Sequence, residues 1–474
     1  MAERFQRDSE CLGYGLARWT ANLLTMKTVR FNDALENARK LLATSEIVRK
    51  KGPENFVLIR DLYGRFRLLC PKLDNDDTEN LEKSIRNELG SGSGMERPLL
   101  FDKDFFEAAK IRSNPQIQEL LLDSKLRTMI PFLDRGVIGG DWLGARETAS
   151  CTDSASCANK RVVFFGLKGG VGRTTALCMT ARHFSRLGLK VLVVDVDLES
   201  PGLGSLLLPQ SDLPSLGIID WFMEDGLEQD TSEILDEVVA TSSLAADFRG
   251  SIRVAPAFGR DEKGYIPKLS RVYADLARPG NQCHNSFADR FLRMLGEIEE
   301  KERPDLVLLD SRAGLHDIAA TLLVKVPNAL RLLFAHNSPQ TWAGYELLFR
   351  HWQAFPRNLA NFRDGLQLVD AMMPETGREA HRESFVSSGY LLFNNTLYED
   401  IEAGKEIGDA FNFQEDDSEA PHFGPAISWD RKFMEFNPNE SGSSFHEEDL
   451  IRVVFGSLIT CVAQRLGFDT SSTL

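Results

Sequence analysis

The sequence predicts an α/β protein with a mostly parallel, doubly wound sheet, preceded by a smaller and mainly helical N-terminal region. Two observations lead to this prediction. From residue 160 onward, short and continuously apolar runs such as 162–165 and 191–194 alternate with helical segments, which is typical of parallel strands covered on both faces. Residues 28–89 instead place apolar side chains at helical spacing, beginning at Phe31.

Each further element follows from its own pattern. A helix over 174–187 follows a glycine-rich loop, and the stretch 449–466 has an apolar face that predicts a closing helix packed on the core. A membrane anchor in that position would need more basic residues than Arg452 and Arg465. We expect additional strands at 252–255, 305–309, 330–335 and 389–393, and additional helices at 78–89, around 120–122 and around 130–133.

Small and polar residues mark the expected domain borders. Residues 90–94 read Gly-Ser-Gly-Ser-Gly, a flexible composition that is either a natural hinge or the join of an artificial fusion. We therefore expect a small helical interaction or adaptor domain at 1–89, a linker and helical connector at 90–159, and a large α/β domain at 160–474. Trp142 is expected to pack the connector on the large domain.

Charge separates the two parts of the chain. The formal net charge of the 474 residues is −15. Residues 1–150 hold 24 Lys/Arg and 23 Asp/Glu, a net of +1, which leaves 31 basic and 47 acidic residues and a net of −16 for 151–474. An acidic body disfavours nucleic acid or an anionic membrane as the main ligand, although DNA stays possible through a local patch.

Cysteine usage and apolar runs indicate the compartment. The seven cysteines are scattered, odd in number and without a C-x-x-C pair, which fits reduced thiols. The first residues lack the apolar core of a signal peptide, and no apolar run approaches the roughly 20 residues that span a bilayer. We therefore expect a cytoplasmic protein without membrane attachment.

A strand, a glycine-rich loop and a helix follow one another at the start of the large domain. Glycines let backbone N–H groups converge on phosphate oxygens, and the N-terminus of the helix adds its dipole. The Thr174 hydroxyl is placed to bind Mg²⁺, and Thr175 to contact a phosphate. A plain Gly-rich turn is the alternative. The loop reads Lys168-Gly169-Gly170-Val171-Gly172-Arg173-Thr174-Thr175.

Acidic residues close two of the predicted strands. Asp195 and Asp197 follow the run 191–194 and, being two residues apart, point to the same side. A solvated strand edge is the alternative for this pair. The apolar run that starts at Asp305 ends at Asp310, which is the position of an acid that binds Mg²⁺ through water.

The loop resembles the deviant Walker A motif of the ParA/MinD branch of P-loop ATPases, whose pattern is K-G-G-x-G-K-T-T. The resemblance extends over about 160–466 and leaves residues 1–150 outside. It implies that Lys168 crosses a dimer interface to the partner's nucleotide, that Asp197 positions the attacking water, and that Asp195 supports the metal shell. Arg173 stands where the family has its second lysine. Arginine keeps the charge but is longer and planar, so we expect nucleotide binding to persist, while the case for fast hydrolysis is weaker.

Three more positions are interpreted through the same resemblance. Ser311–Gly314 resembles the family's D-x-P-x-G region with Arg312 in place of proline, and this arginine either reaches a phosphate in cis or forms a surface ion pair. Residues 389–395 resemble the strand whose terminal asparagine reads adenine, which makes Asn394 the first candidate and Asn395 the second. A turn-forming asparagine is the alternative. No T-K-x-D or N-K-x-D motif is present, so ATP is favoured over GTP.

The resemblance therefore implies an ATP-binding and ATP-hydrolysing switch that uses Mg²⁺ and positions or regulates a partner complex. ATP would close a homodimer, hydrolysis would open it, and residues 1–89 would recruit a protein partner. The alternative is a weakly or non-hydrolysing, nucleotide-gated scaffold or adaptor in a signalling or defence assembly. Arg173 favours this alternative, whereas Asp197, Asp310 and Thr174 favour the ATPase.

Overall fold

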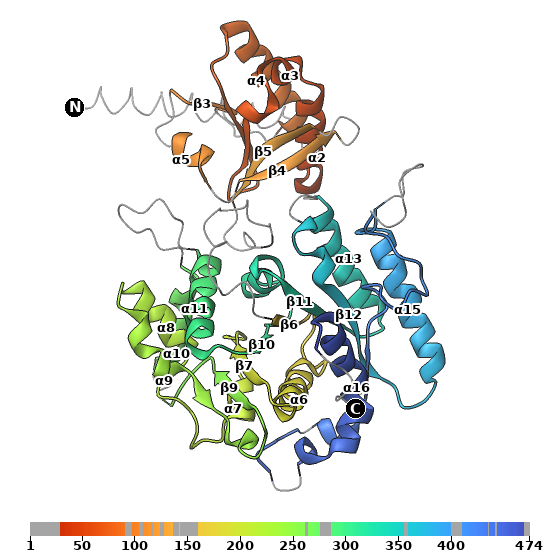
Figure 1. Ribbon diagram of the computed structural model, residues 1–474. Coiled ribbons are helices and arrows are strands. Elements are labelled where there is room, and N and C mark those ends of the chain that lie inside the picture. The colour runs from red at the N-terminus through yellow and green to blue at the C-terminus, as the bar shows by residue number, and fades with distance from the viewer. Residues whose placement is uncertain are drawn as a thin grey trace, which may run out of the picture. The chain divides into compact units, whose positions relative to one another are not determined.

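The chain divides into two compact units, Met1–Gly140 and Asp141–Leu474, which are described separately (Figure 1). Within them, the computed structural model describes residues 29–90, 97–103, 108–114, 117–123, 128–135, 142, 160–260, 264–274, 286–354, 359–399, 410–434, 436–440 and 443–468.

The first unit is built on a five-stranded mixed sheet with the order β3-β2-β1-β5-β4. β1 pairs antiparallel with β2 and parallel with β5, while β4 and β5 are antiparallel and β2 and β3 are parallel. The strands are β1 (Val57–Arg60), β2 (Phe66–Cys70), β3 (Leu99–Phe101), β4 (Gln118–Asp123) and β5 (Thr128–Asp134).

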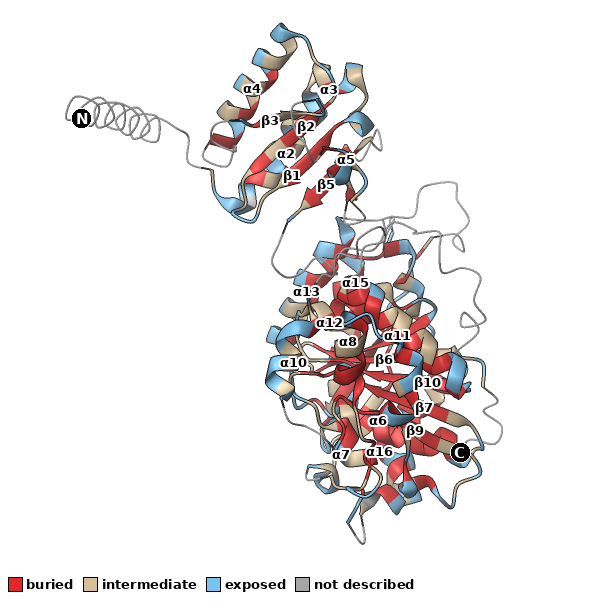
Figure 2. Cartoon of the chain, turned by 90° about the vertical axis from the view of Figure 1, so that its left-hand side faces the viewer, coloured by how far each residue is buried: buried red, intermediate tan, exposed pale blue. Residues whose placement is uncertain are grey.

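Two long helices cover one face of this sheet. The helices of the unit are α2 (Phe31–Thr44), α3 (Glu46–Lys51), α4 (Asn75–Leu89) and α5 (Ala108–Arg112). α4 begins at Asp74, whose carboxylate accepts the backbone N–H of Asp77 at 2.8 Å, so an N-cap fixes its start. The apolar faces of α2 and α4 pack with those of β1 and β2 into one buried cluster, seen in red in Figure 2.

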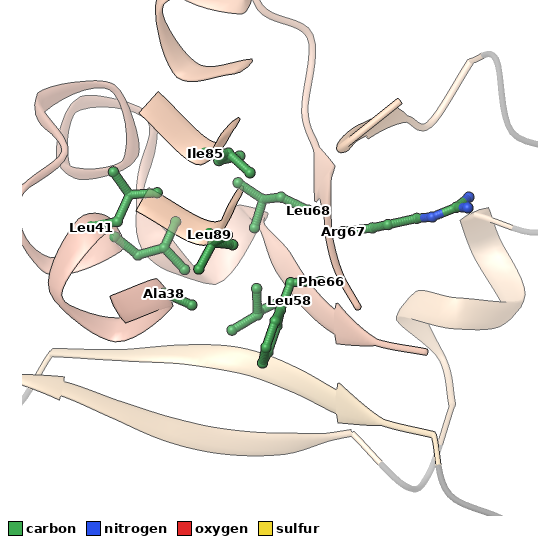
Figure 3. A pocket seen from close by; sticks show the side chains of 9 residues that line it. Ala38, Leu41, Leu58, Phe66, Arg67, Leu68, Ile85 and Leu89 are labelled. Atoms are coloured by element: carbon green, nitrogen blue, oxygen red, sulfur yellow. The ribbon is translucent and has the colours of Figure 1, made fainter. Parts of the chain in front are cut away.

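A narrow recess lies between α2, α4 and the sheet. The apolar side chains that line it point toward one another, whereas the Arg67 side chain points away (Figure 3). The recess is therefore an imperfection of the apolar core and presents no reactive group. Its lining residues are Ala38, Leu41, Leu42, Leu58, Phe66, Arg67, Leu68, Ile85 and Leu89.

The first unit corrects part of the expected organisation. The helices predicted from Phe31 and over 78–89 are confirmed as α2 and α4, but the runs around 120–122 and 130–133 are strands, not helices. Buried and half-exposed residues alternate along β4, which is the two-residue period of a strand. Because β3, β4 and β5 complete the sheet of β1 and β2, no domain border lies at 89/90. The Gly-Ser stretch after Gly90 lies outside the described residues.

The second unit contains an eight-stranded sheet with the order β13-β12-β11-β6-β10-β7-β9-β8. All neighbours are parallel except β8, which runs antiparallel to β9. The mostly parallel sheet is thus confirmed. The strands are β6 (Lys160–Gly166), β7 (Lys190–Asp195), β8 (Ala240–Thr241), β9 (Ser251–Ala255), β10 (Leu306–Asp310), β11 (Ala329–Ala335), β12 (Leu366–Met373) and β13 (Ala426–Ser428).

Helices cover both faces of this sheet, as expected for a doubly wound fold. One face packs against α6 (Arg173–Arg186), α7 (Leu203–Leu207) and α16 (Glu448–Arg465). The other packs against α8 (Ile218–Gly226), α11 (Phe287–Glu302), α13 (Pro339–Gln353) and α15 (Arg378–Asn394). The remaining elements are α9 (Leu235–Val238), α10 (Tyr265–Val272), α12 (Asp317–Ala320) and a π turn, Thr321–Lys325. Short 3-10 turns occur at Pro53–Asn55, Thr231–Ile234, Ser243–Ala245, Arg363–Gly365, Arg431–Phe433 and Ser444–His446.

Most strand predictions for the second unit are confirmed, but the strand predicted at 389–393 is a helix, and β12 was not predicted. The run 389–393 is the end of helix α15, in which Phe385, Gly389 and Leu392 are buried at helical spacing while Leu391 is exposed. The strand of this region is β12, which the apolar pattern did not reveal because it carries the buried polar residues Gln367 and Asp370. Both are partnered, Gln367 by backbone carbonyls and Asp370 by His381.

Smaller expectations are also resolved. The predicted closing helix is α16, whose buried face lies in the core of the second unit. Trp142 packs in that unit's other core, with its ring 6.4 Å from that of Trp352. Cys70, Cys178 and Cys461 are free thiols, and the other four cysteines lie outside the described residues. Among the helices described, none has the length and apolarity needed to cross a membrane.

A buried ion pair fixes α11 against the start of β6. Arg161 donates from Nε to Oε1 of Glu299 at 2.7 Å and from Nη2 to Oε2 at 2.5 Å, and the two side chains are 4% and 0% exposed. Nη1 of Arg161 also donates to the carbonyl of Pro327 at 3.3 Å. The pair therefore ties a sheet-covering helix to the central strand of the sheet.

We predict that Glu299→Ala lowers the free energy of unfolding by about 3–5 kcal/mol, because it leaves the Arg161 guanidinium buried without its carboxylate. Denaturant unfolding followed by circular dichroism measures this change. The double variant Arg161→Met/Glu299→Leu should lose much less. As a control, Glu346→Ala breaks an exposed pair with Arg350 and should change stability by less than about 1 kcal/mol. Equal losses at the buried and the exposed pair would contradict the prediction.

Candidate functional site

The glycine-rich loop lies at the carboxyl end of β6, between the central strand of the sheet and helix α6. Gly170 and Gly172 have φ of 73° and 77°, the left-handed region that side-chain-bearing residues rarely adopt. A Cβ added at Gly169, Gly170 or Gly172 would meet no atom within 4 Å. The glycines therefore serve the backbone path and leave an open cradle above the loop.

Helix α6 starts at this cradle without a side-chain cap. Its N-cap residue is Gly172, and no side chain accepts the first backbone N–H groups of the helix. An α-helix of 14 residues directs its positive dipole end and these donors toward the loop. The arrangement suits an anion such as a phosphate group, as predicted for Gly169, Gly170, Val171 and Gly172. Val171 itself is buried in the core below the loop, and Thr175 is half-buried on the first turn of α6.

Thr174, Asp310 and Asp195 meet beneath the loop. Asp310 and Asp195 are register partners in the parallel pair of β10 and β7, so their carboxylates leave neighbouring strands on the same side. The Thr174 hydroxyl donates to Oδ2 of Asp310 at 2.8 Å. Both acids are buried, with 1% and 3% exposure for Asp195 and Asp310. Oδ1 of each has no hydrogen-bond partner within the described part of the chain.

Burial changes the protonation of both acids. It raises the pKa of Asp195 to about 8, with a further increase from the negative charge of Asp310. It raises the pKa of Asp310 to about 6, although the Arg173 guanidinium and the Thr174 hydroxyl pull the pKa down. Two buried carboxyls with too little positive charge beside an anion cradle are suited to a divalent cation, which favours their ionised forms.

The donor set fits magnesium. No group of three or more His, Cys, Asp or Glu suited to a metal occurs in the described ranges, so these hold no all-protein cage. Mg²⁺ needs none, because it keeps waters and substrate phosphate oxygens in its shell and takes one or two carboxylates from the protein. The Thr174 hydroxyl and the unpaired Oδ1 atoms of Asp195 and Asp310 are such oxygen donors.

Asp197 stands just beyond this group and is 9% exposed. Its Oδ1 accepts the backbone N–H of Ser200 at 3.2 Å, which fixes the carboxylate. Burial raises its pKa, while the Ser200 N–H and the side chains of Arg173, Arg312 and His316 counteract that rise. Asp197 is therefore a shielded acceptor at the edge of the cradle, which suits the orientation of a water molecule.

The two cationic residues of the loop have different surroundings. Arg173 is 8% exposed, and its Nη1 donates to the backbone carbonyl of Ser311. Its charge acts on both Asp310 and Asp197. Lys168 is exposed, and its Nζ donates to Oε1 of Gln340 on α13 at 2.5 Å. Arg173 is thus held inside the site, whereas Lys168 stays accessible from outside.

The adenine role expected of Asn394 and Asn395 is wrong. β12 is parallel to β11, so its last residue, Met373, lies at the same edge of the sheet as the loop. α15 starts five residues later and runs back along the sheet. Just beyond its end, Glu399 pairs at 2.6 Å with Arg363, which precedes β12. Both asparagines therefore lie at the edge opposite the loop, at the end of a helix and not of a strand.

Sequence reasoning missed several groups near the site. Glu199 follows Asp197 by two residues and contacts Arg312, His316 and Tyr273. The alternating acids at 195, 197 and 199 were a signal for Glu199. Tyr273 and Gln340 come from distant parts of the chain and gave no signal.

Comparison with known proteins places this site in a family. Residues 162–343 match the model of the CobQ/CobB/MinD/ParA nucleotide binding domain. No curated protein sequence matches the chain.

Among solved structures, a pNOB8 ParA bound to nonspecific DNA is 15% identical, with 65% of this chain and 99% of that chain covered and a TM-score of 0.39. A ParA family ATPase from Chlorobium tepidum TLS is 14% identical, with 64% and 99% covered and a TM-score of 0.39. Cobyrinic acid a,c-diamide synthase from Mycobacterium smegmatis, with bound ATP analog and magnesium, is 16% identical, with 48% and 81% covered and a TM-score of 0.33. Residues 162–343 match the nucleotide binding domain model of CobQ/CobB/MinD/ParA, in agreement with the predicted resemblance to ParA/MinD-type ATPases.

Proposed function

We propose that the second unit binds ATP together with Mg²⁺ and hydrolyses it as a dimeric switch that positions or regulates a partner complex. The observation that supports this most is the meeting of Thr174, Asp310 and Asp195 beneath an open glycine cradle. The unpaired Oδ1 atoms of both acids are donors for a cation that accompanies a nucleotide.

In the proposed reaction, the oxygen of a water molecule attacks the γ-phosphorus of ATP. The bond between that phosphorus and the β–γ bridging oxygen breaks, its electron pair stays on ADP, and both protons of the water end on the released phosphate. Asp197 accepts a hydrogen bond from the water and orients it for attack in line with the leaving oxygen. Mg²⁺, when bound, neutralises phosphate charge. Arg173 adds positive charge at the phosphates from within the same chain.

Dimerisation would complete the site. Lys168 is exposed, and its contact with the side chain of Gln340 is a single hydrogen bond. A phosphate of the nucleotide bound to a second copy can replace that bond. An ammonium group that crosses to the other nucleotide would couple hydrolysis to closure of the dimer. Opening after hydrolysis would then release whatever the closed dimer holds.

The first unit would carry the protein partner. We assigned this role to residues 1–89, and the sheet that β3, β4 and β5 complete extends it to the whole unit. Large apolar side chains gather at the β1–β2 turn, where Phe31, Leu62 and Tyr63 are 60%, 61% and 82% exposed. Such a group fits contact with another protein better than with DNA, which the acidic second unit also disfavours. A cytoplasmic location remains part of this proposal.

One observation favours the second candidate, a nucleotide-gated scaffold with little or no turnover. The guanidinium of Arg173 is bound to the carbonyl of Ser311, which follows Asp310 in the chain. A side chain held in this way contributes less to charge that develops on the phosphate during hydrolysis. The site would then bind ATP, close, and stay closed.

We predict that Asp197→Asn lowers ATP turnover by more than about 100-fold, because the amide no longer accepts the water's hydrogen bond as a carboxylate does. ATP affinity should change by less than about threefold, because Asp197 orients water and does not hold the nucleotide. Phosphate release and isothermal titration calorimetry measure the two quantities. Unchanged turnover would remove Asp197 from the mechanism, and absence of turnover in the unmodified protein would favour the scaffold.

We predict that turnover per molecule rises with protein concentration and that Lys168→Ala abolishes this rise. The substitution removes the cation that would cross to the second copy while leaving the cradle of the same chain intact. Phosphate release over a hundredfold range of protein concentration measures the effect. Lys301→Ala, which removes a lysine of α11 that pairs with Asp236 on α9, is the control and should behave like the unmodified protein. Turnover independent of concentration would argue against a dimeric site.

We predict that Arg173→Ala weakens ATP binding by about 10–100-fold, the usual loss for a charge-assisted hydrogen bond. Arg173→Lys should bind ATP within about threefold of the unmodified protein, because lysine is also a phosphate-binding side chain. Titration calorimetry with ATP and Mg²⁺ provides both values. A large increase of turnover in Arg173→Lys would show that the arginine restrains hydrolysis and would support the scaffold.

A further inference from the structure

Glu199 contacts three side chains from two separate segments beside the proposed hydrolytic site. Arg312 forms an ion pair with its carboxylate, Nε2 of His316 lies 3.3 Å from Oε1, and the Tyr273 hydroxyl donates to Oε1 at 3.1 Å. The adjacent backbone is fixed as well, because the Tyr265 hydroxyl donates to the carbonyl of Leu198 at 2.6 Å. A carboxylate with this many partners at a loop is more than a solvated surface acid.

The ion pair joins the two loops that carry the acids of the site. Arg312 follows Asp310 by two residues, and Glu199 follows Asp197 by two residues. The loops are adjacent, since the backbone N–H of Val196 donates to the carbonyl of Asp310 at 3.0 Å. The guanidinium is also close enough to Asp197 to lower the pKa of that carboxyl. Arg312 therefore stands beside the residue that would orient the attacking water.

We propose that Arg312 is a γ-phosphate-sensing arginine that Glu199 holds away from the nucleotide until ATP binds. The inference rests on the proposed binding of ATP at the glycine cradle. A γ-phosphate in the cradle competes with the Glu199 carboxylate for the guanidinium, and Arg312 moves from the carboxylate to phosphate oxygens. ADP lacks this group and leaves the pair closed. The two interpretations of Arg312 from sequence, a phosphate ligand and an ion pair, are then two states of one side chain.

The surroundings allow Arg312 to leave. Its side chain is 32% exposed and that of Glu199 is 21% exposed, so the pair is only partly shielded from water and is weak compared with a buried one. Glu199 keeps Tyr273 and His316 as partners after the arginine departs. A planar guanidinium that gains two phosphate oxygens gains a stronger interaction than it gives up.

His316 is suited to replace the departing charge. Burial lowers the pKa of its imidazole, and the positive charge of Arg312 lowers it further. Removal of that positive charge makes protonation of His316 easier, and a protonated imidazole is a cation for the Glu199 carboxylate. The acid therefore does not become an isolated buried charge when Arg312 binds phosphate.

Movement of Arg312 to the γ-phosphate would also assist the reaction. Negative charge spreads over the γ-phosphate oxygens during phosphoryl transfer, and an arginine at that place accelerates P-loop enzymes by about 10³–10⁵-fold. Arg173 is engaged by the Ser311 carbonyl. Arg312 would supply the positive charge that Arg173 offers less effectively while it is bound to that carbonyl. Sensing of the γ-phosphate and stabilisation of the transferred group would then be done by one side chain.

The test compares affinity for a slowly hydrolysed ATP analogue, ATPγS, with affinity for ADP, both with Mg²⁺, by titration calorimetry. Arg312→Ala should lower the preference for ATPγS about tenfold, with Arg312→Lys in between. Glu199→Gln should raise that preference about 2–5-fold, because the arginine is no longer held. Turnover of ATP should fall about 100-fold in Arg312→Ala and should not fall in Glu199→Gln.

The controls use a matched pair outside the site. Arg350→Ala and Glu346→Gln break an exposed arginine–carboxylate pair on α13 and should leave the preference unchanged. Thermal melting identifies any variant that has lost its fold. If Arg312→Ala and Glu199→Gln change the preference in the same direction, or leave it unchanged, the pair is merely structural and the proposal is overturned.

The outcomes also separate this inference from the proposed function. An unmodified protein that never hydrolyses ATP, but whose variants shift the preference in opposite directions, retains the sensing arginine and loses the ATPase. An unmodified protein that hydrolyses ATP, with variants that show no shift, retains the ATPase and loses the sensing arginine. A protein that binds neither nucleotide excludes both.

Discussion

The burial of Asp195 and Asp310 at the adjoining ends of two neighbouring strands is the constraint on which the second unit depends. Parallel pairing in exact register brings the two carboxylates together, and removal from water raises the pKa of both. Such a pair is tolerable only where donors or cations are supplied nearby. Helix α6 brings the Thr174 hydroxyl and the Arg173 charge, and the backbone N–H of Gly204 reaches Asp195 at 3.4 Å. Because α6 is packed in the core, these groups are held by rigid elements.

Other buried charges of the same unit are stabilised by hydrogen bonds and ion pairs within the protein. Asp225 receives Nε of Arg290 at 2.7 Å and Nη2 of Arg293 at 2.5 Å, and these bonds outweigh burial so that the pKa of its carboxyl is lowered. Arg331 donates to the backbone carbonyls of several residues around the start of β11. At Asp195 and Asp310, by contrast, the pKa is raised and one oxygen of each is unpaired in the described structure. Burial also raises the pKa of Asp370, and one oxygen of Asp370 is unpaired in the described structure, so the feature that distinguishes Asp195 and Asp310 is their pairing at the edge where a glycine loop opens.

The sequence was most informative where local pattern and local chemistry coincide. The strand, glycine loop and helix around Lys168 are one continuous segment, so order and spacing were enough to predict the fold of the second unit and the acids at Asp195 and Asp310. Prediction failed where tertiary contacts decide. β12 was overlooked because Asp370 interrupts its apolar run, and that carboxylate lies 2.9 Å from His381 and 3.8 Å from Arg382, both on α15. The apolar residues that suggested a strand at 389–393 belong to helix α15. The assignment of Asn394 to adenine was wrong because it assumed that strand.

The first unit shows the same limit from another side. Short apolar runs of four or five residues fit a strand or a buried helix equally well, and only the pairing partner decides. β5 becomes a strand because it lies between β1 and β4, which come from segments about 60 residues apart in the chain. The Gly-Ser stretch after Gly90 suggested a border at the point where the chain returns to the same sheet. Composition therefore indicated a domain border wrongly.

The two arginines of the site are best understood together. Relative to the family pattern, Arg173 at the start of α6 replaces a lysine, and Arg312, two residues after Asp310, replaces a proline. Arg173 is bound to the Ser311 carbonyl and Arg312 to Glu199, so each guanidinium has a partner before any nucleotide arrives. A lysine offers a point charge that needs no such partner, whereas a planar guanidinium exchanges one oxygen acceptor for another with little loss. In the proposal above, binding of a γ-phosphate, rather than of any nucleotide, is the event that moves Arg312 from Glu199 to phosphate oxygens beside Asp197.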